Sequence, residues 1–540
     1  MTPAEFRRLG RAAVDWVADY WERLESLPVA PAAAPGAVGD RLPAAPPPEG
    51  ERFEDLLADL DDLVVPGLLH WQHPRFFGYF PANTSGPAVL ADLLSAGLGV
   101  QGMSWFTGPA CTEVEQRVLD WLADLLDLPA RFRSAGPGGG VIQDTASSAL
   151  LVAVVAALHR ASGGTARRDG VGERRYGLYV TAETHSSATK AAVVAGLGER
   201  AVRHVPTDPA THAMDPAALG RRLARDAAGG VRPLLVVATV GTTGTTAVDP
   251  VAAIGALARR YGLWLHVDAA YAGVAAVCPE LRWLHDGVAE YADSYCTNPH
   301  KWLLTTFDCD TFWVGDRTWL TGALQILPEY LRNTATDTGA ATDFRDWQVP
   351  LGRRFRALKL WAVLRWYGVE GLRRHIRRGV AMAAQFAGWV AADPRFAVVA
   401  PHPLGLVCFR LRGPAGGDPD AVNAALRDRV NGSGTAFLTH TRVGGRLTLR
   451  LAVGGVHTEE VHVRQAWDCI AAHAADVLSA AAGRDPASAP PPHRGGLSAP
   501  GAAGTARRRA AAIATGPPPA ATRTIGRVRR PRGTGIPHDT

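Results

Sequence analysis

Lysine is scarce in this chain, and its scarcity draws attention to one position. Of the 57 basic residues, only Lys190, Lys301 and Lys359 are lysine. Arginine stays protonated, whereas a lysine amine can lose its proton, act as a nucleophile and form an imine. Lys301 stands between His300 and Trp302 in NPHKW, where partly apolar surroundings favour the neutral amine. We therefore predict a covalent role for Lys301, whereas Lys359 in RALKLW is interpreted as structural.

A carboxylate follows an apolar run that reads as a strand. Asp268 lies in LHVDAAYAG, residues 265–273, directly after that run. An unpaired carboxylate there is costly, so Asp268 needs a cationic partner. The protonated pyridine nitrogen of a cofactor would be a fitting partner. Thr243, in VGTTGTTAVD, lies on a neighbouring predicted loop.

Two further segments complete a set of groups that could hold a flat, phosphorylated ring. Thr145, Ala146 and Ser147 open a predicted helix, whose free N–H groups and dipole suit a phosphate, although a simple capped turn has the same sequence. His185, in THSSATKAA, lies where a predicted strand meets a helix and could stack on a ring and supply a proton. A lone histidine is more often structural. The order phosphate loop, His, Asp and Lys is the stronger signal.

The elements around these residues alternate between strand and helix from about residue 138. Short runs that are apolar on both faces predict strands over 177–182, 232–240, 263–270 and 293–298. The stretches between them predict helices over 144–162, 186–197, 216–228 and 250–261. This alternation indicates an α/β domain with a mostly parallel sheet, which binds ligands at the carboxyl ends of its strands.

Other segments flank this domain. Residues 1–27 predict an amphipathic helix, 28–50 an extended connector, and 112–126 a further helix. After about residue 372 the pattern becomes α+β, with helices over 372–392, 418–431 and 458–481 and strands over 405–413 and 446–454. We predict four regions, which are an N-terminal helical dimerisation segment (1–82), a large cofactor-binding domain (83–371), a small C-terminal domain (372–482) and a disordered tail (483–540).

The composition and charge of the chain limit the classes of protein to which it can belong. The chain is 47% hydrophobic and 20% charged, as in globular proteins, and no run of about 18 apolar residues predicts a membrane span. Residues 484–540 hold ten arginines and two aspartates, so their net charge of +8 leaves −2 for the rest of the +6 chain. No aromatic residues lie between these arginines, so we expect no nucleic-acid partner.

The six scattered cysteines indicate a reducing, cytoplasmic environment. His70 and His73 have no further metal ligands near them in the sequence, so we expect no metal site.

The chain resembles the pyridoxal-dependent group II decarboxylases, specifically the aromatic-L-amino-acid decarboxylase family. The likeness covers about residues 4–481 and depends most on NPHKW together with HVDAAYAG. HWQHPRFFGYFP, GGGVIQDTAS and LPEYLRN also match. The resemblance implies the aspartate aminotransferase type of fold (fold type I), pyridoxal 5′-phosphate (PLP) as cofactor, and a homodimer whose active sites lie at the interface. It also implies decarboxylation of an aromatic L-amino acid to the corresponding amine.

The resemblance also implies a role for each matching residue. Lys301 forms an imine with the cofactor aldehyde, Asp268 pairs with the pyridine nitrogen, and His185 stacks on the ring opposite Ala270. Tyr330, in LPEYLRN, is expected on a mobile loop from which it returns a proton. The residues implied to hold the phosphate are Thr145, Ala146, Ser147, Asn298 and His300. The residues implied to line the substrate side are Trp71, Tyr79, Phe80, Pro81, Ala82, Gln101, Met103, Thr243 and Gly352.

Several positions depart from the family pattern. Animal members often read QGSAS where this chain reads QDTAS, so Asp144 adds a carboxylate near the phosphate, which we expect to point away. Ala82, Gln101 and Met103 replace a hydroxyl, an aliphatic and an aromatic residue of the animal enzymes. Gly352, in PLGRRFR, leaves room for a large ring. Tryptophan and 5-hydroxytryptophan are therefore candidate substrates beside phenylalanine, tyrosine and L-DOPA.

Two other functions are open. An aromatic aldehyde synthase uses the same scaffold, and in the family a phenylalanine in place of the loop tyrosine accompanies that activity, so Tyr330 argues for plain decarboxylation. A catalytically silent binding protein with this fold is opposed by the intact Lys301, Asp268 and His185.

Overall fold

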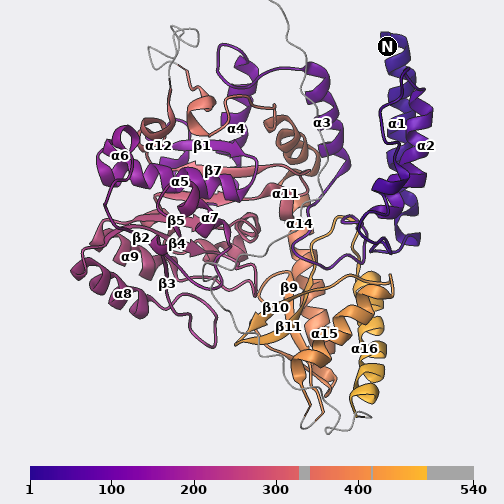
Figure 1. Ribbon diagram of the computed structural model, residues 1–540. Coiled ribbons are helices and arrows are strands. Elements are labelled where there is room, and N and C mark those ends of the chain that lie inside the picture. Colours follow the sequence, from indigo (N-terminus) through magenta and orange to yellow (C-terminus); the bar gives the residue numbers. More distant parts are fainter. Residues whose placement is uncertain (327–340, 415–416, 483–540) are drawn as a thin grey trace, which may run out of the picture. The chain divides into compact units, whose positions relative to one another are not determined.

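The structure is a computed structural model that describes residues 1–326, 341–414 and 417–482 (Figure 1). All of these residues fall within one compact unit, Met1–Pro486. Tyr330 and the basic tail lie outside the described residues, and the division of this unit into three regions stays a prediction. Its helices are α1 (Pro3–Arg23), α2 (Phe53–Asp59), α3 (Gly86–Leu98), α4 (Pro109–Leu125), α5 (Ala146–Ser162), α6 (Thr165–Asp169), α7 (Ser187–Val194), α8 (Pro216–Ala228), α9 (Val251–Tyr261), α10 (Val288–Tyr291), α11 (Pro299–Trp302), α12 (Arg317–Leu324), α14 (Ala357–Ala392), α15 (Pro419–Gly432) and α16 (Glu460–Ala482).

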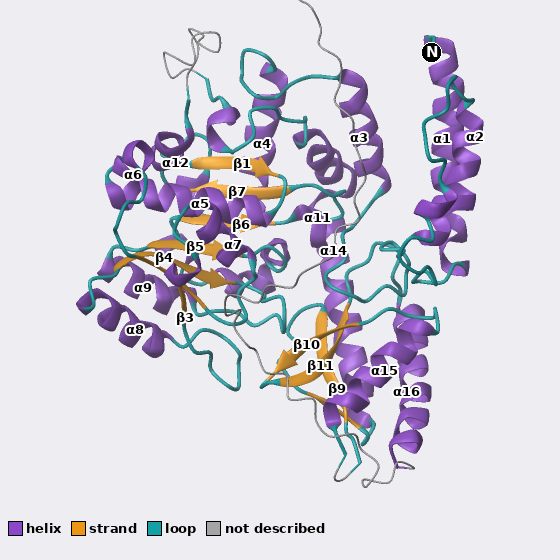
Figure 2. Cartoon of the chain, in the orientation of Figure 1, coloured by secondary structure: helices purple, strands orange, loops and turns teal. Residues whose placement is uncertain are grey.

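The larger sheet has seven strands in the described part of the chain (Figure 2). In spatial order they are β1 (Gly139–Gln143), β7 (Asp310–Val314), β6 (Ser294–Thr297), β5 (Trp264–Asp268), β4 (Arg232–Thr239), β2 (Tyr176–Val180) and β3 (Val202–His204). Only β7 runs against its neighbours, since it pairs antiparallel with both β1 and β6. The predicted mostly parallel α/β sheet is therefore confirmed.

Helices cover both faces of this sheet, which explains why its strands are apolar on both sides. In β4, Leu235 and Val237 pack with residues of α5, α7 and α12. Val236 and Ala238, which point the other way, pack with residues of α4, α8 and α9. Strand β1 leads into α5 and runs in the same direction as β6, so the N-terminus of α5 lies at the edge where the parallel strands end.

A second, antiparallel sheet follows the long helix α14. Its strands are β10 (Thr439–Val443), β11 (Arg446–Ala452), β9 (Leu406–Leu411) and β8 (Phe396–Val398), in that spatial order. The predicted helix over 372–392 is the second part of α14, which begins at Ala357 and is interrupted at Gly368, where φ is 59°. Lys359 lies in the first part, with its side chain 1% exposed and its amine 3.3 Å from Asp92 Oδ2. Lys359 is therefore structural, as predicted.

The N-terminal helix α1 packs beside α2. Arg8 forms an ion pair with Glu54, and Trp16 Nε1 donates to Asp61 Oδ2 at 3.0 Å. The apolar residues of α1 stay largely uncovered: Leu9 is buried, whereas Phe6 is 57% exposed. In the described part of the chain, no helix combines the length and the apolarity that crossing a membrane would require.

Candidate active site

The predicted functional residues gather at one edge of the larger sheet. Strands β4, β5 and β6 run parallel and end there, at Thr239, Asp268 and Thr297. Strand β1 ends at the same edge and leads into α5, while the antiparallel β7 begins there at Asp310. The carboxyl edge of the sheet therefore collects the phosphate-loop, acid and lysine segments (Figure 2).

Lys301 lies in the short helix α11, and its surroundings favour the neutral amine. Burial lowers the pKa of Lys301, although the nearby carboxyl group of Asp268 opposes the shift. Its Nζ lies 5.9 Å from the centre of the Phe80 ring. The side-chain amide of Asn83 donates to the Lys301 carbonyl, and Asn83 N donates to His300 O at 2.9 Å. The lysine is thus held on a fixed backbone, with an amine suited to nucleophilic attack.

Asp268 is buried at the end of β5 and receives two weak donors. Its Oδ1 accepts from Ala270 N at 3.1 Å and lies 3.9 Å from Cys296 Sγ. Behind Cys296 lies His266, whose pKa burial lowers to about 4. A neutral thiol and a neutral imidazole cannot balance a carboxylate, so Asp268 remains available to a cation at the strand end.

His185 occupies the turn between β2 and α7, where the residue is exposed although the surrounding site partly desolvates its imidazole. Ser187 N donates to His185 Nδ1 at 3.2 Å, so the proton of the neutral ring resides on Nε2. Burial of the surrounding site lowers the pKa of His185, and Lys301 lowers it further, while Asp268 raises it. The structure therefore brings His185, Asp268 and Lys301 into one electrostatic environment.

Three segments around the start of α5 supply hydrogen-bond donors. Among the described hydrogen bonds, none uses the backbone N–H groups of Ala146 and Ser147, in the first turn of α5. The Nδ1 of buried His300 accepts from Cys309 N at 2.9 Å, and burial lowers the pKa of this imidazole to about 3. His300 is therefore neutral, with its other nitrogen as a donor. Asn298 is buried too, and its Oδ1 has no partner among the described residues.

The expectation that Asp144 points away is wrong, because its carboxylate turns onto the N-cap of α5. Its Oδ1 accepts from Thr145 N at 2.6 Å and from Thr145 Oγ1 at 3.4 Å. The Asp144 carboxylate thus accepts from the N–H of Thr145 and leaves the N–H groups of Ala146 and Ser147 for another anion.

These groups fit PLP. The site offers a lysine whose pKa is lowered by burial, a buried carboxyl group at a strand end, an exposed imidazole and a helix N-terminus with unused donors. Each matches one part of the cofactor, namely the aldehyde, the pyridine nitrogen, the ring face and the phosphate. Thr243 is exposed on the loop after β4, and Ala270 is half-buried after β5.

One group of predicted substrate residues lies beside Lys301. The rings of Trp71 and Tyr79 stack with centroids 5.3 Å apart, and Phe80 stacks on Tyr271 at 3.7 Å. Arg450 holds this segment, since its guanidinium donates to Tyr79 O at 3.3 Å and lies 5.2 Å from the Phe80 ring centre. Pro81 is buried next to them, and Ala82 is half-buried.

A second group lies apart from the first. Gln101 and Gly352 line a cavity of about 320 Å³, and Lys301 is not among the described residues that line it. Gln101 Oε1 accepts from Arg353 N at 3.3 Å, and a side chain at position 352 would meet that same oxygen. Met103 follows Gly102, whose N–H donates to the carbonyl of Arg353, a residue that lines the cavity, at 3.1 Å. Within one chain, the predicted substrate residues therefore lie in two separate groups.

Sequence reasoning missed three residues of this site, Asn83, Arg450 and Asp310. The side chains of Asn83 and Arg450 donate to backbone carbonyls that are distant in the sequence, so no local sequence pattern identifies these two residues. Asp310 had a signal, because it is a carboxyl group beside the apolar residues of DTFWV, as Asp268 is beside those of its strand. No cluster of three or more candidate metal ligands occurs among the residues that the structure describes.

Comparisons with known proteins agree with this geometry. The model of the "Pyridoxal-dependent decarboxylase conserved domain" matches residues 35–412. Phenylacetaldehyde synthase of Arabidopsis thaliana is 44% identical over 484 residues, which cover 88% of this chain and 97% of that protein. Aromatic-L-amino-acid decarboxylase of Sus scrofa is 44% identical over 493 residues, with 90% and 99% covered. The crystal structure of Catharanthus roseus tryptophan decarboxylase in complex with L-tryptophan superposes with a TM-score of 0.84, at 41% identity, with 88% and 99% covered.

Proposed function

The chain belongs to the pyridoxal-dependent decarboxylase family, and we propose on that premise that it converts an aromatic L-amino acid to its arylalkylamine and CO2. The observation that carries the proposal is Lys301, the NPHKW lysine, which has a lowered pKa and lies beside both Asp268 and the aromatic ring of Phe80. When bound, PLP supplies an aldehyde for amines and an electron sink for loss of the carboxylate.

The residues of this chain have distinct tasks in the proposed reaction. Lys301 would supply the amine that attaches the cofactor. Asp268 would pair with the protonated pyridine nitrogen, and His185, with its proton on Nε2, would serve as a proton donor near the ring. The backbone of α5, Asn298 and His300 would hold the phosphate, with Thr145 and Ser147 beside them.

The aromatic character of the substrate agrees with the group beside Lys301. Trp71, Tyr79 and Phe80 offer ring faces and edges that favour an aromatic side chain. Of these rings, Phe80 is buried and lies nearest to the amine, so it lowers the local polarity and strengthens the electrostatic interactions of Asp268 there. The same rings leave open which of tryptophan, 5-hydroxytryptophan, phenylalanine, tyrosine and L-DOPA is preferred.

A second candidate activity is aromatic aldehyde synthesis, which the 44% identity to the Arabidopsis phenylacetaldehyde synthase favours. Tyr330, which lies outside the described residues, argues for decarboxylation, because a tyrosine hydroxyl can return a proton to the substrate carbon before oxygen reacts there. General acid catalysis is typically worth about 10²–10⁴-fold. Replacing Tyr330 by Phe therefore reduces amine formation steeply and diverts part of the substrate to aldehyde and peroxide.

Product analysis distinguishes these activities. Wild type and Tyr330→Phe, both loaded with PLP, are incubated in air with each of the five amino acids, and amine, aldehyde, peroxide and CO2 are quantified. We expect equal amounts of CO2 and amine from wild type, and additional aldehyde from the variant. Mostly aldehyde from wild type would replace the proposal by the second activity, and no CO2 from any of the five would refute both.

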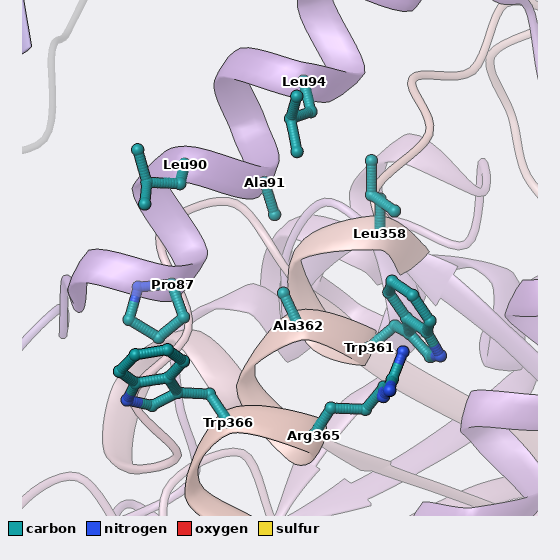
Figure 3. Close-up of a pocket in the computed structure, with 9 residues that line it drawn as sticks. All are labelled: Pro87, Leu90, Ala91, Leu94, Leu358, Trp361, Ala362, Arg365 and Trp366. Atoms are coloured by element: carbon teal, nitrogen blue, oxygen red, sulfur yellow. The ribbon is translucent and has the colours of Figure 1, made fainter.

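We also propose that the protein is a homodimer whose active sites lie at the interface. An apolar depression between α3 and α14 is lined by Leu90, Leu94, Trp361 and Trp366, drawn in Figure 3. Trp366 is 73% exposed in the single chain, and exposed apolar patches of this kind mark protein contacts. A second copy of the chain would cover this surface.

The divided substrate residues support the same proposal. Gln101 and Gly352 line a cavity whose described lining does not include Lys301, and a second copy of the chain could bring such a pair to the lysine without rearranging the fold. The uncovered apolar face of α1 offers a further surface for a partner. We propose in addition a cytoplasmic location, because all six cysteines are unpaired, as expected in a reducing compartment.

Light scattering after size-exclusion chromatography tests the dimer. A charge at Leu94, which is 62% exposed, introduces repulsion into the proposed interface, so Leu94→Asp gives an inactive monomer. The matched control is Leu42→Asp, at a leucine that is 51% exposed on the connector, and it remains dimeric and active. An active monomeric Leu94→Asp protein would contradict the proposal.

A further inference from the structure

Asp310, the first residue of β7, is a buried carboxyl group without a hydrogen-bond partner. Its side chain is fully buried, and neither Oδ1 nor Oδ2 has a partner among the described residues. An ionised carboxylate in such a place is strongly disfavoured unless a cation or several donors balance it. The group therefore requires either a partner or a proton.

The strand registers place two buried side chains beside Asp310. Gln143 of β1 pairs with Asp310 directly, but its Nε2 already donates to Trp347 O at 2.9 Å. The second candidate lies on the β6 side. Thr297 of β6 pairs with Thr311 of β7 in an antiparallel register, and Thr311 Oγ1 donates to Thr297 O at 3.0 Å. The register ends with Thr297, the last residue of β6, and one further step would bring Asn298 opposite Asp310. Opposed residues of an antiparallel pair have Cβ atoms about 4.5–5.5 Å apart on the same face. The buried Oδ1 of Asn298 has no partner among the described residues either.

The charged groups around Asp310 oppose its ionisation. Burial raises the pKa of Asp310 well above its usual range, and the carboxylates of Asp268 and Asp144 raise it further. Lys301 acts in the opposite direction, but its own pKa is lowered by burial and it is also close to Asp268. Burial raises the pKa of the neighbouring Cys296 thiol well above its usual range, so Cys296 stays neutral and adds no negative charge beside Asp310.

The phosphate decides how the Asn298 amide must be turned. A phosphate accepts hydrogen bonds and donates none at neutral pH, so an asparagine that binds it must present its N–H₂ group. The amide oxygen then faces the sheet, towards β7. An ionised Asp310 would set three unpaired acceptor oxygens against one another, whereas a single proton on Asp310 would provide the missing donor.

We propose that Asp310 is a positioning residue: it stays a neutral carboxylic acid and donates its proton to Asn298 Oδ1, so that the Asn298 N–H₂ group faces the cofactor phosphate. The inference rests on the assignment of Asn298 to the phosphate made under the proposed function. It predicts that Asp310 affects binding of the phosphate and not of the pyridine ring.

Titration of the cofactor-free protein with PLP and with pyridoxal, which lacks the phosphate, tests this role. Asp310→Ala removes the donor and frees the Asn298 amide, so the Kd for PLP rises about 10–100-fold, as for loss of a hydrogen bond to a charged group, while the Kd for pyridoxal changes little. Asp310→Asn is the matched control. Its amide can still donate to Asn298 Oδ1, and PLP binding stays close to that of wild type.

The possible results separate this inference from the assignment it rests on. If wild type binds PLP no better than pyridoxal, the phosphate site itself is wrong. If wild type prefers PLP and Asp310→Ala keeps that preference, or weakens both ligands equally, the positioning role of Asp310 is wrong.

Infrared spectroscopy tests the proton directly and does not require the alanine variant to fold. The difference spectrum of PLP-loaded wild type minus Asp310→Asn should contain the C=O stretch of a protonated carboxylic acid, shifted on exchange into D₂O. Carboxylate bands in its place would mean that Asp310 is ionised and would overturn the inference.

Discussion

The buried ion pair between Glu115 of α4 and Arg353 gives a quantitative prediction, because it fixes the loop that carries Gly352. Both side chains are 2% exposed, with Arg353 Nη2 2.7 Å from Glu115 Oε1 and Nη1 3.1 Å from Oε2. Arg353 also donates to the carbonyl of Ile142, whose own N–H donates to Glu115 Oε1 at 2.7 Å. The pair therefore joins α4, β1 and the Gly352 loop.

Glu115→Gln removes the only carboxylate that pairs with the Arg353 guanidinium among the described residues. An uncompensated charge remains in the interior, and breaking a buried pair in this way costs about 3–5 kcal/mol. We expect the free energy of unfolding, measured in urea, to fall by that amount. Because Arg353 N donates to Gln101 Oε1, the KM for the aromatic substrate should rise as well.

Two variants make this prediction sharp. Glu113→Gln changes an exposed carboxylate on the same helix, which accepts from Trp105 Nε1 at 2.8 Å, and should alter stability by about 0.5 kcal/mol or less. Replacing both members of the buried pair, Glu115→Leu with Arg353→Met, should recover most of the loss, because no charge is left unpaired. A Glu115→Gln protein within about 1 kcal/mol of wild type, or a double variant no better than the single one, would refute the reasoning.

Two further predictions follow from the described side chains. Five buried histidines have pKa values lowered to about 3 or 4, so they stay neutral in the folded protein while the unfolded chain takes up protons below about pH 6.5. Their stabilising contribution is complete above that pH and is lost as the pH falls towards 4, by up to about 1.4 kcal/mol per pH unit for each histidine. Urea unfolding at pH 7.5 and 5.5 measures the loss, and equal stability at both would contradict it. The five histidines are His73, His266, His285, His300 and His375. In the second prediction, Asn83→Ala leaves the Lys301 carbonyl without its amide donor. It should lower the free energy of unfolding by about 1–3 kcal/mol and slow cofactor loading, whereas unchanged loading kinetics would exclude this role.

The sequence predicted the parallel strands well but missed two of the strands at the site. Strands such as β4 and β5 are continuous apolar runs, a local property that a single segment reveals. By contrast, β1 reads GGVIQ, and its glycines were interpreted as part of a phosphate loop. Strand β7 begins with a carboxylate, and its antiparallel place between β1 and β6 is a non-local property.

The site shows the same division. Lys301, Asp268 and His185 follow from residue chemistry at predicted strand ends, and the structure brings them together. The partners of Asn83 and Arg450 are backbone carbonyls of segments far away along the chain, so no pattern within one segment could predict them. The cavity that contains Gln101 and Gly352 is formed by segments about 250 residues apart in the sequence, so no pattern within one segment could predict that it lacks Lys301 among its described lining residues.

The measurement that tests the central claim most directly is CO2 release by PLP-saturated wild type and Lys301→Arg from the five aromatic L-amino acids. Arginine keeps the positive charge but cannot form the imine, so the substitution removes the covalent chemistry and leaves the net charge of the chain unchanged. We predict CO2 with an equal amount of amine from wild type, and CO2 at the buffer background from the variant, whose folding is checked by its unfolding curve. Release by Lys301→Arg at a rate near that of wild type would contradict the account.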